Sequence, residues 1–355
     1  MASLKPDAAT GRVPPKVRFR DPQIEMAHGA GGIASRRLIE GLFAPLLFDS
    51  ANEPLGDSAA LEIAGARVAI TTDCFVVKPL GFPGGSIGEL AINGTVNDLA
   101  VSGARPHSIV VTFILEAGLP TDVLEAEVRA MAEAAQRAGV SVVGGDTKVV
   151  EHGMADRMYI TTTGVGSFLS GVHVNPRSVR SGDRVVLSGP IGDHGITILL
   201  ARGDLDLEAD LRSDTRSVFP LVEAMARVAA PGLRWMRDPT RGGVATSLNE
   251  LARDCGLGIH LSEDRIPVRD GVRGACELLG LDPLHIANEG QFLAVVAPDY
   301  ADMALNELRQ TIGGNEAVII GEVHEQPAGS VLITTEYGGS RIIDMLVGDP
   351  LPRIC

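Results

Sequence analysis

Four aspartates in the first half of the chain stand where carboxylates could hold a divalent cation. Each ends an apolar, strand-like run or lies in a helix beside a turn; they are Asp57, Asp73, Asp98 and Asp146. Single oxygen ligands from separate elements suit Mg²⁺, which binds one or two carboxylates together with phosphate oxygens and water. Aspartate also ends strands and caps helices without any ligand, so each residue alone is ambiguous. Together the four favour magnesium bound to a triphosphate.

Two glycine-rich segments could bring backbone N–H groups close to an anion. They are HGAGG at 28–32 and VVGGDTK at 142–148. Neither is a Walker A motif or a Rossmann fingerprint, and a bare glycine loop is a weak signal. In the second segment, Gly144 and Gly145 follow a strand-like run, and Lys148 supplies a cation that could contact phosphate. This segment is therefore a candidate phosphate-binding loop.

A polar turn and a glutamate in the second half are further candidates. The segment RDPTRGGVATSLNELA at 237–252 opens a helix behind a turn that contains Asp238, Thr240 and Arg241. A helix N-terminus with a preceding arginine is a natural anion seat, although Arg241 could equally be a solvated residue beside an N-cap. Glu289 precedes an apolar strand-like run, where a carboxylate could act as a general base. Most glutamates in such a position are simply surface residues.

The chain ends in the sequence PRIC, so Cys355 is its last residue. A prenylation signal places its cysteine four residues from the end, so this terminus does not fit one. A thiol on an extended arm could be loaded at one site and moved to another, and its thiolate is the reactive form. A terminal cysteine that arose by chance is the competing interpretation.

Periodic apolar residues predict a mixed α/β domain in the first half of the chain. Short β-branched runs bounded by Gly, Pro or Asp are typical of strands, and apolar residues at helical spacing are typical of helices. Strands are expected at 59–63, 68–72, 109–115 and 158–165, and helices at 86–101 and 121–138. We expect Thr121 or Asp122 to cap the second helix.

The same pattern starts afresh in the second half. Helices are expected at 215–230, 241–255, 269–279 and 299–313, and strands at 184–188, 291–297 and 317–320. The expected organisation is a flexible N-terminal extension at 1–22, an ATP-binding domain at 23–170, an α+β domain at 171–335 and a flexible tail at 336–355. The length of 355 residues suits two domains of ordinary size.

Composition excludes several classes of function. A net charge of -14 would repel a phosphate backbone and anionic lipids, so nucleic acid and membrane surface are poor partners. No apolar run approaches the roughly 20 residues of a membrane helix, and the first residues lack an apolar signal-peptide centre, so a cytoplasmic location is expected. The four cysteines form no C-x-x-C pair, which argues against a disulfide framework and a zinc site.

Seven segments together resemble the HypE family of hydrogenase maturation proteins. They are AHGAGG, TTDCFVV, NGTVNDLAVSGA, VVGGDTKVV, RDPTRGGVA, NEGQFLAVV and the closing PRIC. The resemblance spans nearly the whole chain apart from the N-terminal extension. Several motifs are shared with aminoimidazole ribonucleotide synthetase, selenophosphate synthetase and thiamine-monophosphate kinase, whereas AHGAGG with a terminal PRIC is specific to the HypE family.

The resemblance implies a two-domain aminoimidazole ribonucleotide synthetase-like α/β (α+β) fold in a homodimer whose N-terminal domains pair their sheets. It implies ATP and Mg²⁺ as cofactors, bound near the dimer interface. Carried over by motif, the nucleotide ligands are Gly31, Gly32, Thr72, Asp73, Asn97, Gly144, Gly145, Asp146, Lys148 and Arg241. The metal ligands are Asp57, Asp73, Asp98 and Asp146. Cys355 becomes the carrier, and Glu289 is our hypothesis for the base.

The implied reaction explains why a terminal thiol and an ATP site occur in one chain. The partner HypF loads a carbamoyl group onto Cys355, and phosphorylation of the amide oxygen by ATP creates a better leaving group than hydroxide. Loss of phosphate and of the amide protons leaves an S-cyanide. Cyanide then passes to iron held by the HypC–HypD complex.

Two other functions stay open at this stage. A superfamily kinase or synthetase that acts on a free small molecule would stay active without Cys355. A non-enzymatic maturation scaffold would bind nucleotide only as a structural ligand and would show no tail-dependent ATP hydrolysis.

Overall fold

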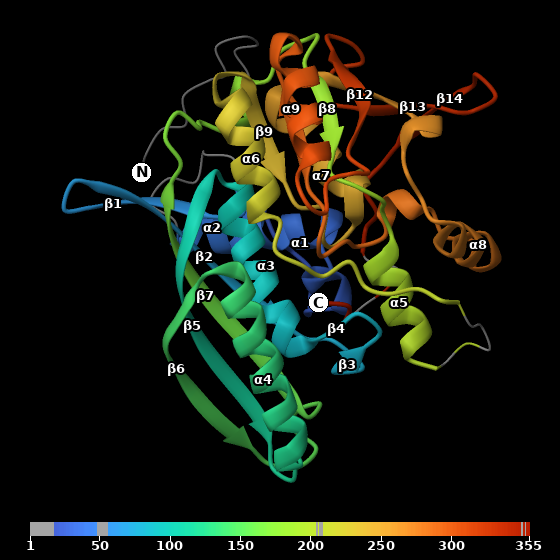
Figure 1. The fold of residues 1–355 in the computed structure, drawn as a ribbon. Coiled ribbons are helices and arrows are strands. Elements are labelled where there is room, and N and C mark those ends of the chain that lie inside the picture. Colours follow the sequence, from blue (N-terminus) through green and yellow to red (C-terminus); the bar gives the residue numbers. More distant parts are fainter. Residues whose placement is uncertain (1–17, 48–55, 204, 206–208, 349–350, 352) are drawn as a thin grey trace.

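The computed structural model describes residues 18–47, 56–203, 205, 209–348, 351 and 353–355 (Figure 1). Most of the predicted N-terminal extension, residues 1–17, lies outside the described residues, as does Pro352 of the terminal motif. In the described part of the chain, no helix is long and apolar enough to cross a membrane.

The N-terminal half forms a five-stranded sheet with the order β1-β2-β7-β5-β6. Only β5 and β6 run parallel; the other neighbours are antiparallel. The strands are β1 (Ala59–Ile63), β2 (Ala66–Phe75), β5 (Ala104–Glu116), β6 (Ser141–Val150) and β7 (Met158–Phe168). A short hairpin of β3 (Gly81–Phe82) and β4 (Gly85–Ser86) lies beside the sheet.

Two helices, α3 (Ile87–Val101) and α4 (Thr121–Ala138), cover one face of this sheet (Figure 1). Apolar residues of α3 such as Leu90 and Ile92 are fully buried. Contrary to expectation, α4 is preceded at its N-cap position by Pro120, and no side chain caps it. Among the described residues, no helix covers the other face, and β6 is exposed along almost its whole length.

The C-terminal half forms a seven-stranded sheet with the order β14-β13-β10-β12-β8-β11-β9. Its strands are β8 (Arg184–Leu187), β9 (Leu233–Arg237), β10 (Gly258–Ser262), β11 (Leu293–Val296), β12 (Val318–His324), β13 (Val331–Thr334) and β14 (Ser340–Ile343). Residues of β8 alternate between two cores because strand side chains point to opposite faces. Val186 packs in the core that includes α6 and α9, whereas Val185 and Leu187 pack with α7.

Helices surround this second sheet and connect it to the first. The longer ones are α5 (Asp193–Ala201), α6 (Phe219–Ala229), α7 (Gly243–Cys255), α8 (Asp270–Leu279) and α9 (Pro298–Gln310). The N-terminal segment forms four short elements in succession. They are the 3₁₀ turn η1 (Met26–Gly29), the helix α1 (Gly32–Leu38), the π-helical turn η2 (Ile39–Phe43) and the helix α2 (Ala44–Leu47). Single 3₁₀ turns occur at Pro176–Ser178, Ala230–Gly232, Glu263–Arg265 and Pro283–His285.

Each strand and helix expected from periodicity is present within a few residues of its expected bounds. Besides the cap of α4, another local prediction is wrong: residues 142–148 lie inside β6 and form no loop. Gly145 allows close strand pairing there, because a Cβ on this residue would stand 1.8 Å from the Val111 carbonyl oxygen. The domain boundaries themselves stay predictions.

The C-terminal tail returns to the N-terminal half of the molecule. After β14, the backbone N–H groups of Ile33 and Ala34 donate to carbonyl oxygens of tail residues 346 and 347, both at 3.1 Å. The chain end then runs beside residues 76–78, and Val76 N donates to an oxygen of Cys355 at 3.0 Å. The sequence left the resting position of the tail open; here it rests inside the molecule.

Candidate active site

A cavity of about 470 Å³ lies where the N-terminal helices, the first sheet and the second domain meet. It is lined by glycines of the 28–32 segment, by the end of β2 and α3, and by residues from β9 to α7. Of the predicted site residues, those that line it are Gly31, Gly32, Asp57, Thr72, Asp73, Asp98, Arg241, Glu289 and Cys355. The structure therefore gathers parts of the chain that are up to several hundred residues apart.

An acidic cluster forms the inner wall of this cavity. One carboxylate oxygen from each of Asp57, Asp98 and Asp238 lies within 4.8 Å of the others. Asp98 Oδ2 also accepts a hydrogen bond of 2.7 Å from the Thr71 hydroxyl. The loop before β1, the helix α3 and the turn after β9 each supply one member, so the cluster exists only in the folded chain.

The electrostatics of the cluster fit a cation. Burial raises the pKa of Asp98 well above its usual range, and the charges of Asp73, Asp238 and Asp57 raise it further. Burial also raises the pKa of Asp238 well above its usual range, with Asp57 and Asp73 as further causes. Buried like charges at this spacing are unfavourable unless a positive charge joins them. Three oxygen ligands of this kind match the chemistry of Mg²⁺.

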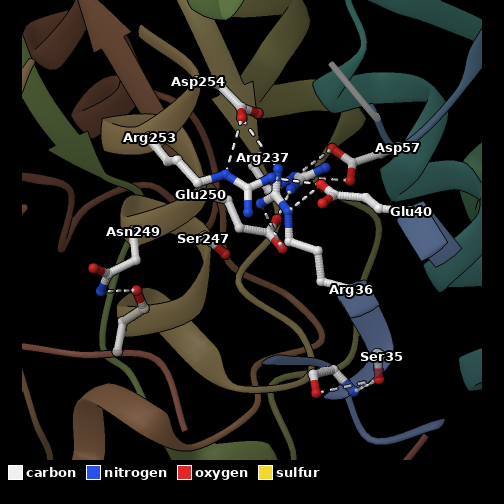
Figure 2. A network of polar contacts seen from close by, with 12 residues as sticks. Ser35, Arg36, Glu40, Asp57, Arg237, Ser247, Asn249, Glu250, Arg253 and Asp254 are labelled. Carbon is white, nitrogen blue, oxygen red and sulfur yellow. Dashed lines mark hydrogen bonds and ion pairs between the residues drawn. The ribbon is translucent and has the colours of Figure 1, made fainter. Parts of the chain in front are cut away.

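Arginines on the rim tie the two halves of the molecule together around the cluster (Figure 2). Arg237 Nε lies 2.9 Å from Asp57, and its Nη1 also pairs with Glu250 at 2.5 Å. Burial would lower the pKa of Arg237, but Asp57 and Glu250 raise it, so the guanidinium stays charged. Arg36 of α1 pairs with Glu250 at 3.4 Å and with Asp254 at 3.1 Å. These ion pairs fix Asp57 at the edge of the cavity.

Asp73 and Arg241 face the cavity from opposite domains. Burial raises the pKa of Asp73, the positive charge of Arg241 opposes this, and Asp57 adds to it. Arg241 Nη1 also donates to the carbonyl oxygen of Gly29. The Thr72 hydroxyl donates to Thr162 O of the neighbouring strand at 3.0 Å. Arg241 therefore supplies a positive charge close to the acidic wall.

At the start of α1, Gly32 leaves room for the tail, and Gly31 lies against Arg241. Gly31 and Gly32 have φ angles of 79° and 71°, which favour glycine. A Cβ on Gly32 would stand 2.4 Å from the carbonyl oxygen of Leu346. The first N–H groups of the helix are used by tail carbonyls, so a nucleotide role for these two glycines stays a prediction.

Glu289 is held by its backbone while its carboxyl group faces the cavity. Asp214 accepts from the N–H groups of Glu289 at 3.0 Å and Gly290 at 3.1 Å. Asn97 donates to Glu289 O at 3.2 Å and to Arg216 O at 3.0 Å. Glu289 is 3% exposed, burial raises its pKa well above the usual range, and among the described residues nothing hydrogen-bonds its Oε1. A free, buried carboxyl oxygen suits a group that exchanges protons.

Five predicted ligands do not line the cavity. Asn97 is buried and bonds to the Glu289 segment as described above. The others lie on β6 at the sheet edge: Gly144, Gly145, Asp146 and Lys148. There Lys148 Nζ pairs with Asp146 at 3.1 Å, and both side chains are exposed. Within one chain these residues do not join the acidic cluster, and their ligand roles stay predictions.

Sequence reasoning missed several residues of the site. Asp238 was noted only as part of a turn, although it ends an apolar strand just as Asp73 does, so the same signal could have found it. Arg36, Arg237 and Glu250 carry no such signal, because only folding brings α1 against β9 and α7.

Family models match both halves of the chain. The N-terminal domain of AIR synthase related proteins matches residues 55–168, and the C-terminal domain of the same proteins matches residues 180–334. Fold and site thus define a two-domain protein of the AIR synthase related class.

Individual relatives narrow this class. The chain is 49% identical over 340 residues to the carbamoyl dehydratase HypE of Azotobacter vinelandii, covering 96% of this chain and 99% of the relative. A crystal structure of a HypE–HypF complex matches with a TM-score of 0.82 and 44% identity, over 87% of this chain and 99% of the other. A crystal structure of HypE in complex with ATP matches with a TM-score of 0.78 and 43% identity, over 94% and 100%.

The chain therefore belongs to the HypE family of carbamoyl dehydratases, which are hydrogenase maturation proteins. This membership confirms the predicted fold class and the predicted enzyme class.

Proposed function

We propose that this chain dehydrates a carbamoyl group carried on the sulfur of Cys355, with consumption of ATP, and thereby makes an S-cyanide. The observation that carries the proposal is that Cys355, Glu289 and the acidic cluster line one cavity. A relative solved in complex with ATP supports the nucleotide as co-substrate. The product is the source of the cyanide ligands of the [NiFe]-hydrogenase iron centre.

The chemistry balances around the amide. The carbamoyl oxygen takes the phosphoryl group and one N–H proton is lost, which gives an S-bound imidate phosphate. The C–O bond then breaks, phosphate leaves and the second N–H proton is lost, so that one water is removed overall. We assign Glu289 as the base for these protons, because its buried carboxyl has an oxygen without a hydrogen-bond partner among the described residues.

Asp57, Asp98 and Asp238 are the residues that would hold Mg²⁺, with Asp73 beside them. When bound, Mg·ATP supplies the phosphoryl group and neutralises charge on its oxygens. Arg241 and the backbone around Gly31 would orient the phosphates from the opposite wall. Asp238 joins the metal ligands predicted from sequence, and Asp146 contributes only if it comes from a second copy.

We infer a homodimer as the working form. The uncovered face and the edge strand β6 expose apolar side chains, with Val143 at 63% and Val149 at 66% exposure. Exposed apolar strand edges are normally covered by another chain or element. Pairing of two such sheets would place Asp146 and Lys148 at the interface between the copies. HypF as loader and a HypC–HypD complex as acceptor complete the proposed partners, and the solved HypE–HypF complex supports the first of these.

The proposal is tested by intact and peptide mass spectrometry. The chain is incubated with HypF, carbamoyl phosphate and ATP, then freed of HypF and given fresh Mg·ATP. We expect the terminal peptide to gain one carbamoyl group and then lose the mass of one water. Cys355→Ala should show neither change, whereas Cys255→Ser, a change of a half-buried thiol outside the cavity, should show both.

Either failure has a defined meaning. An adduct on another cysteine, or ATP-dependent product formation by Cys355→Ala, would favour a kinase or synthetase acting on a free small molecule. Nucleotide binding without any tail-dependent ATP hydrolysis would favour a non-enzymatic scaffold.

A further inference from the structure

The last three residues of the chain lie in a binding site, here called the seat, whose contacts come from both domains. Each residue presents an oxygen to a donor: Lys78 N donates to Arg353 O at 3.3 Å, and Val76 N donates to an oxygen of Cys355 at 3.0 Å. The Ile354 side chain is 1% exposed. Arg202 of the second domain also donates to Arg353 O, at 2.9 Å. The Arg353 guanidinium pairs with Asp156. The seat therefore recognises the backbone of the arm, one apolar side chain and one charged side chain.

The Ile354 carbonyl oxygen is bonded by the side chain of a buried histidine. His194, in the first turn of α5, lies with Nε2 at 2.7 Å from Ile354 O, and its own exposure is 0%. A carbonyl oxygen can only accept, so Nε2 carries the proton and donates it. His194 is thus joined to the carrier arm one residue before the thiol.

A second contact fixes the same tautomer. His194 Nδ1 lies 2.8 Å from the Ser213 hydroxyl, and Thr215 N donates to that hydroxyl oxygen at 3.1 Å. Because the hydroxyl oxygen already accepts from Thr215, its own proton is available for Nδ1. Burial lowers the pKa of His194 to about 4, so the ring is neutral near pH 7 and can hold only one proton.

We propose that His194 is a positioning residue that holds the C-terminal arm in the cavity through the Ile354 carbonyl, with Ser213 fixing its tautomer. The inference rests on the proposed carrier role of Cys355 and deepens it. An arm that must visit a loader, the ATP site and an acceptor needs a seat that holds it and also lets it go. The hydrogen bond from His194 adds to the contacts that Arg353 and Cys355 make. A neutral hydrogen bond of this kind is strong enough to bias the position of the arm and weak enough to break.

The segment that carries Ser213 also positions the proposed base. Asp214, the next residue, holds the backbone of Glu289 and Gly290 as described above. Ser213 N in turn donates to Pro83 O of the first domain at 2.9 Å. Ser213 thus contacts the histidine that holds the arm, and the adjacent Asp214 holds the backbone of the proposed base. The position of the arm and the position of Glu289 are therefore linked through one segment.

The test compares His194→Leu, which lacks the donor, with His194→Gln, whose amide N–H can replace Nε2–H. Alkylation of Cys355 by iodoacetamide is followed in the metal-free, nucleotide-free full-length protein. We expect His194→Leu to raise the rate at Cys355 about 10-fold, and His194→Gln to stay close to wild type. Cys255, half-buried on α7, reports general loosening and should react at an unchanged rate. Equal Cys355 rates in His194→Leu and wild type would overturn the inference.

A second measurement avoids mutation of the histidine. In ¹⁵N-histidine-labelled protein, NMR should show His194 as the Nε2–H tautomer with a slowly exchanging ring proton. A chain that ends at residue 352 should lose the slow exchange of that proton. An unchanged His194 signal in the shortened chain would contradict the inference even if His194→Leu fails to fold.

Kinetics separate positioning from a merely structural role. With HypF and carbamoyl phosphate, loading of His194→Leu should be at least as fast as wild type, while dehydration of the loaded arm should be slower. Loss of both steps in equal measure would contradict a positioning role. If Cys355 is never carbamoylated in wild type, the proposed function fails while the seat stays measurable by alkylation and NMR.

Discussion

At the scale of single residues, the site is dominated by carboxyl groups that are costly to bury. Asp98, Asp238 and Glu289 all have pKa values raised well above the usual range, chiefly by burial. Such an arrangement lowers the stability of the empty protein and prepares it for a cation. The same residue can therefore be unfavourable for folding and necessary for binding.

Asp98→Asn should weaken Mg·ATP binding by roughly 10-fold or more, because it removes a charged ligand from the cluster. Isothermal titration calorimetry at saturating Mg²⁺ measures the affinity. Asp302→Asn, on the exposed side of α9, is the matched control. An unchanged affinity in Asp98→Asn would show that the cluster is not the metal site.

Without metal, the same Asp98→Asn variant should be more stable than wild type, by roughly 1 kcal/mol near neutral pH. The folded-state pKa of Asp98 lies above its unfolded value of 3.8. Protonated Asp98 therefore contributes its full stabilisation to the wild-type protein below pH 3.8. This contribution is lost as the pH rises through the raised folded-state pKa. The advantage of Asp98→Asn should therefore grow with pH. Thermal unfolding in EDTA across about pH 5 to 8 measures it, and a gap that narrows with pH would contradict the sign.

Glu289→Gln should slow dehydration of the loaded arm by about 100-fold or more, because an amide cannot accept the proton. Loading of Cys355 by HypF should be unaffected, which a mass measurement before addition of Mg·ATP checks. Rapid-quench mass spectrometry of the loaded chain gives the dehydration rate. Retention of the wild-type rate would mean that another group is the base.

At the scale of elements, the sequence patterns and the observed helices agree where one face is apolar. Residues 121–138 form α4 as expected, and 243–255 form α7 within the expected helix. The strand β6 was missed because glycines at 144 and 145 resemble a loop in isolation. Pairing with β5 overrides that local signal, since Gly145 fits closely against Val111.

A glycine at each end of α7 allows the cost of steric crowding to be separated from the cost of backbone strain. Gly243 and Gly256 have φ angles of 62° and 73°, but only Gly243 is crowded: a Cβ there would stand 2.5 Å from Leu284 O. Gly256→Ala should lose about 1 kcal/mol from backbone strain alone, and Gly243→Ala should lose clearly more. Urea unfolding of both variants measures the difference. Equal losses would show that the crowding is relieved cheaply.

At the scale of the whole molecule, the two domains meet at the cavity, and the first sheet leaves one face uncovered among the described residues (Figure 1). Ion pairs from α1 to α7 and from Asp57 to β9 cross between the halves. The C-terminal arm adds a further crossing, because it leaves the second domain and ends beside β2. The cavity is consequently a product of domain docking.

Val143→Asp should convert the proposed homodimer to a monomer, because it places a charge on the exposed edge strand. Size-exclusion chromatography with light scattering measures the mass. Val128→Asp, the same substitution at an exposed position of α4, should leave the assembly intact. A Val143→Asp protein that keeps the mass of wild type would place the interface elsewhere.

The sequence by itself determined the fold class, most elements and the types of chemistry. Strand and helix periodicity are local, and the aspartates at strand ends and the terminal thiol are visible as residues. Only the tertiary structure decided which of them meet: it joined Asp238 to Asp57 and Asp98, set Asp146 and Lys148 on an outer strand, and seated Cys355 beside Val76. The physical reason is that these neighbours are set by packing between distant segments and by the cost of burying charge, and neither is written in local sequence.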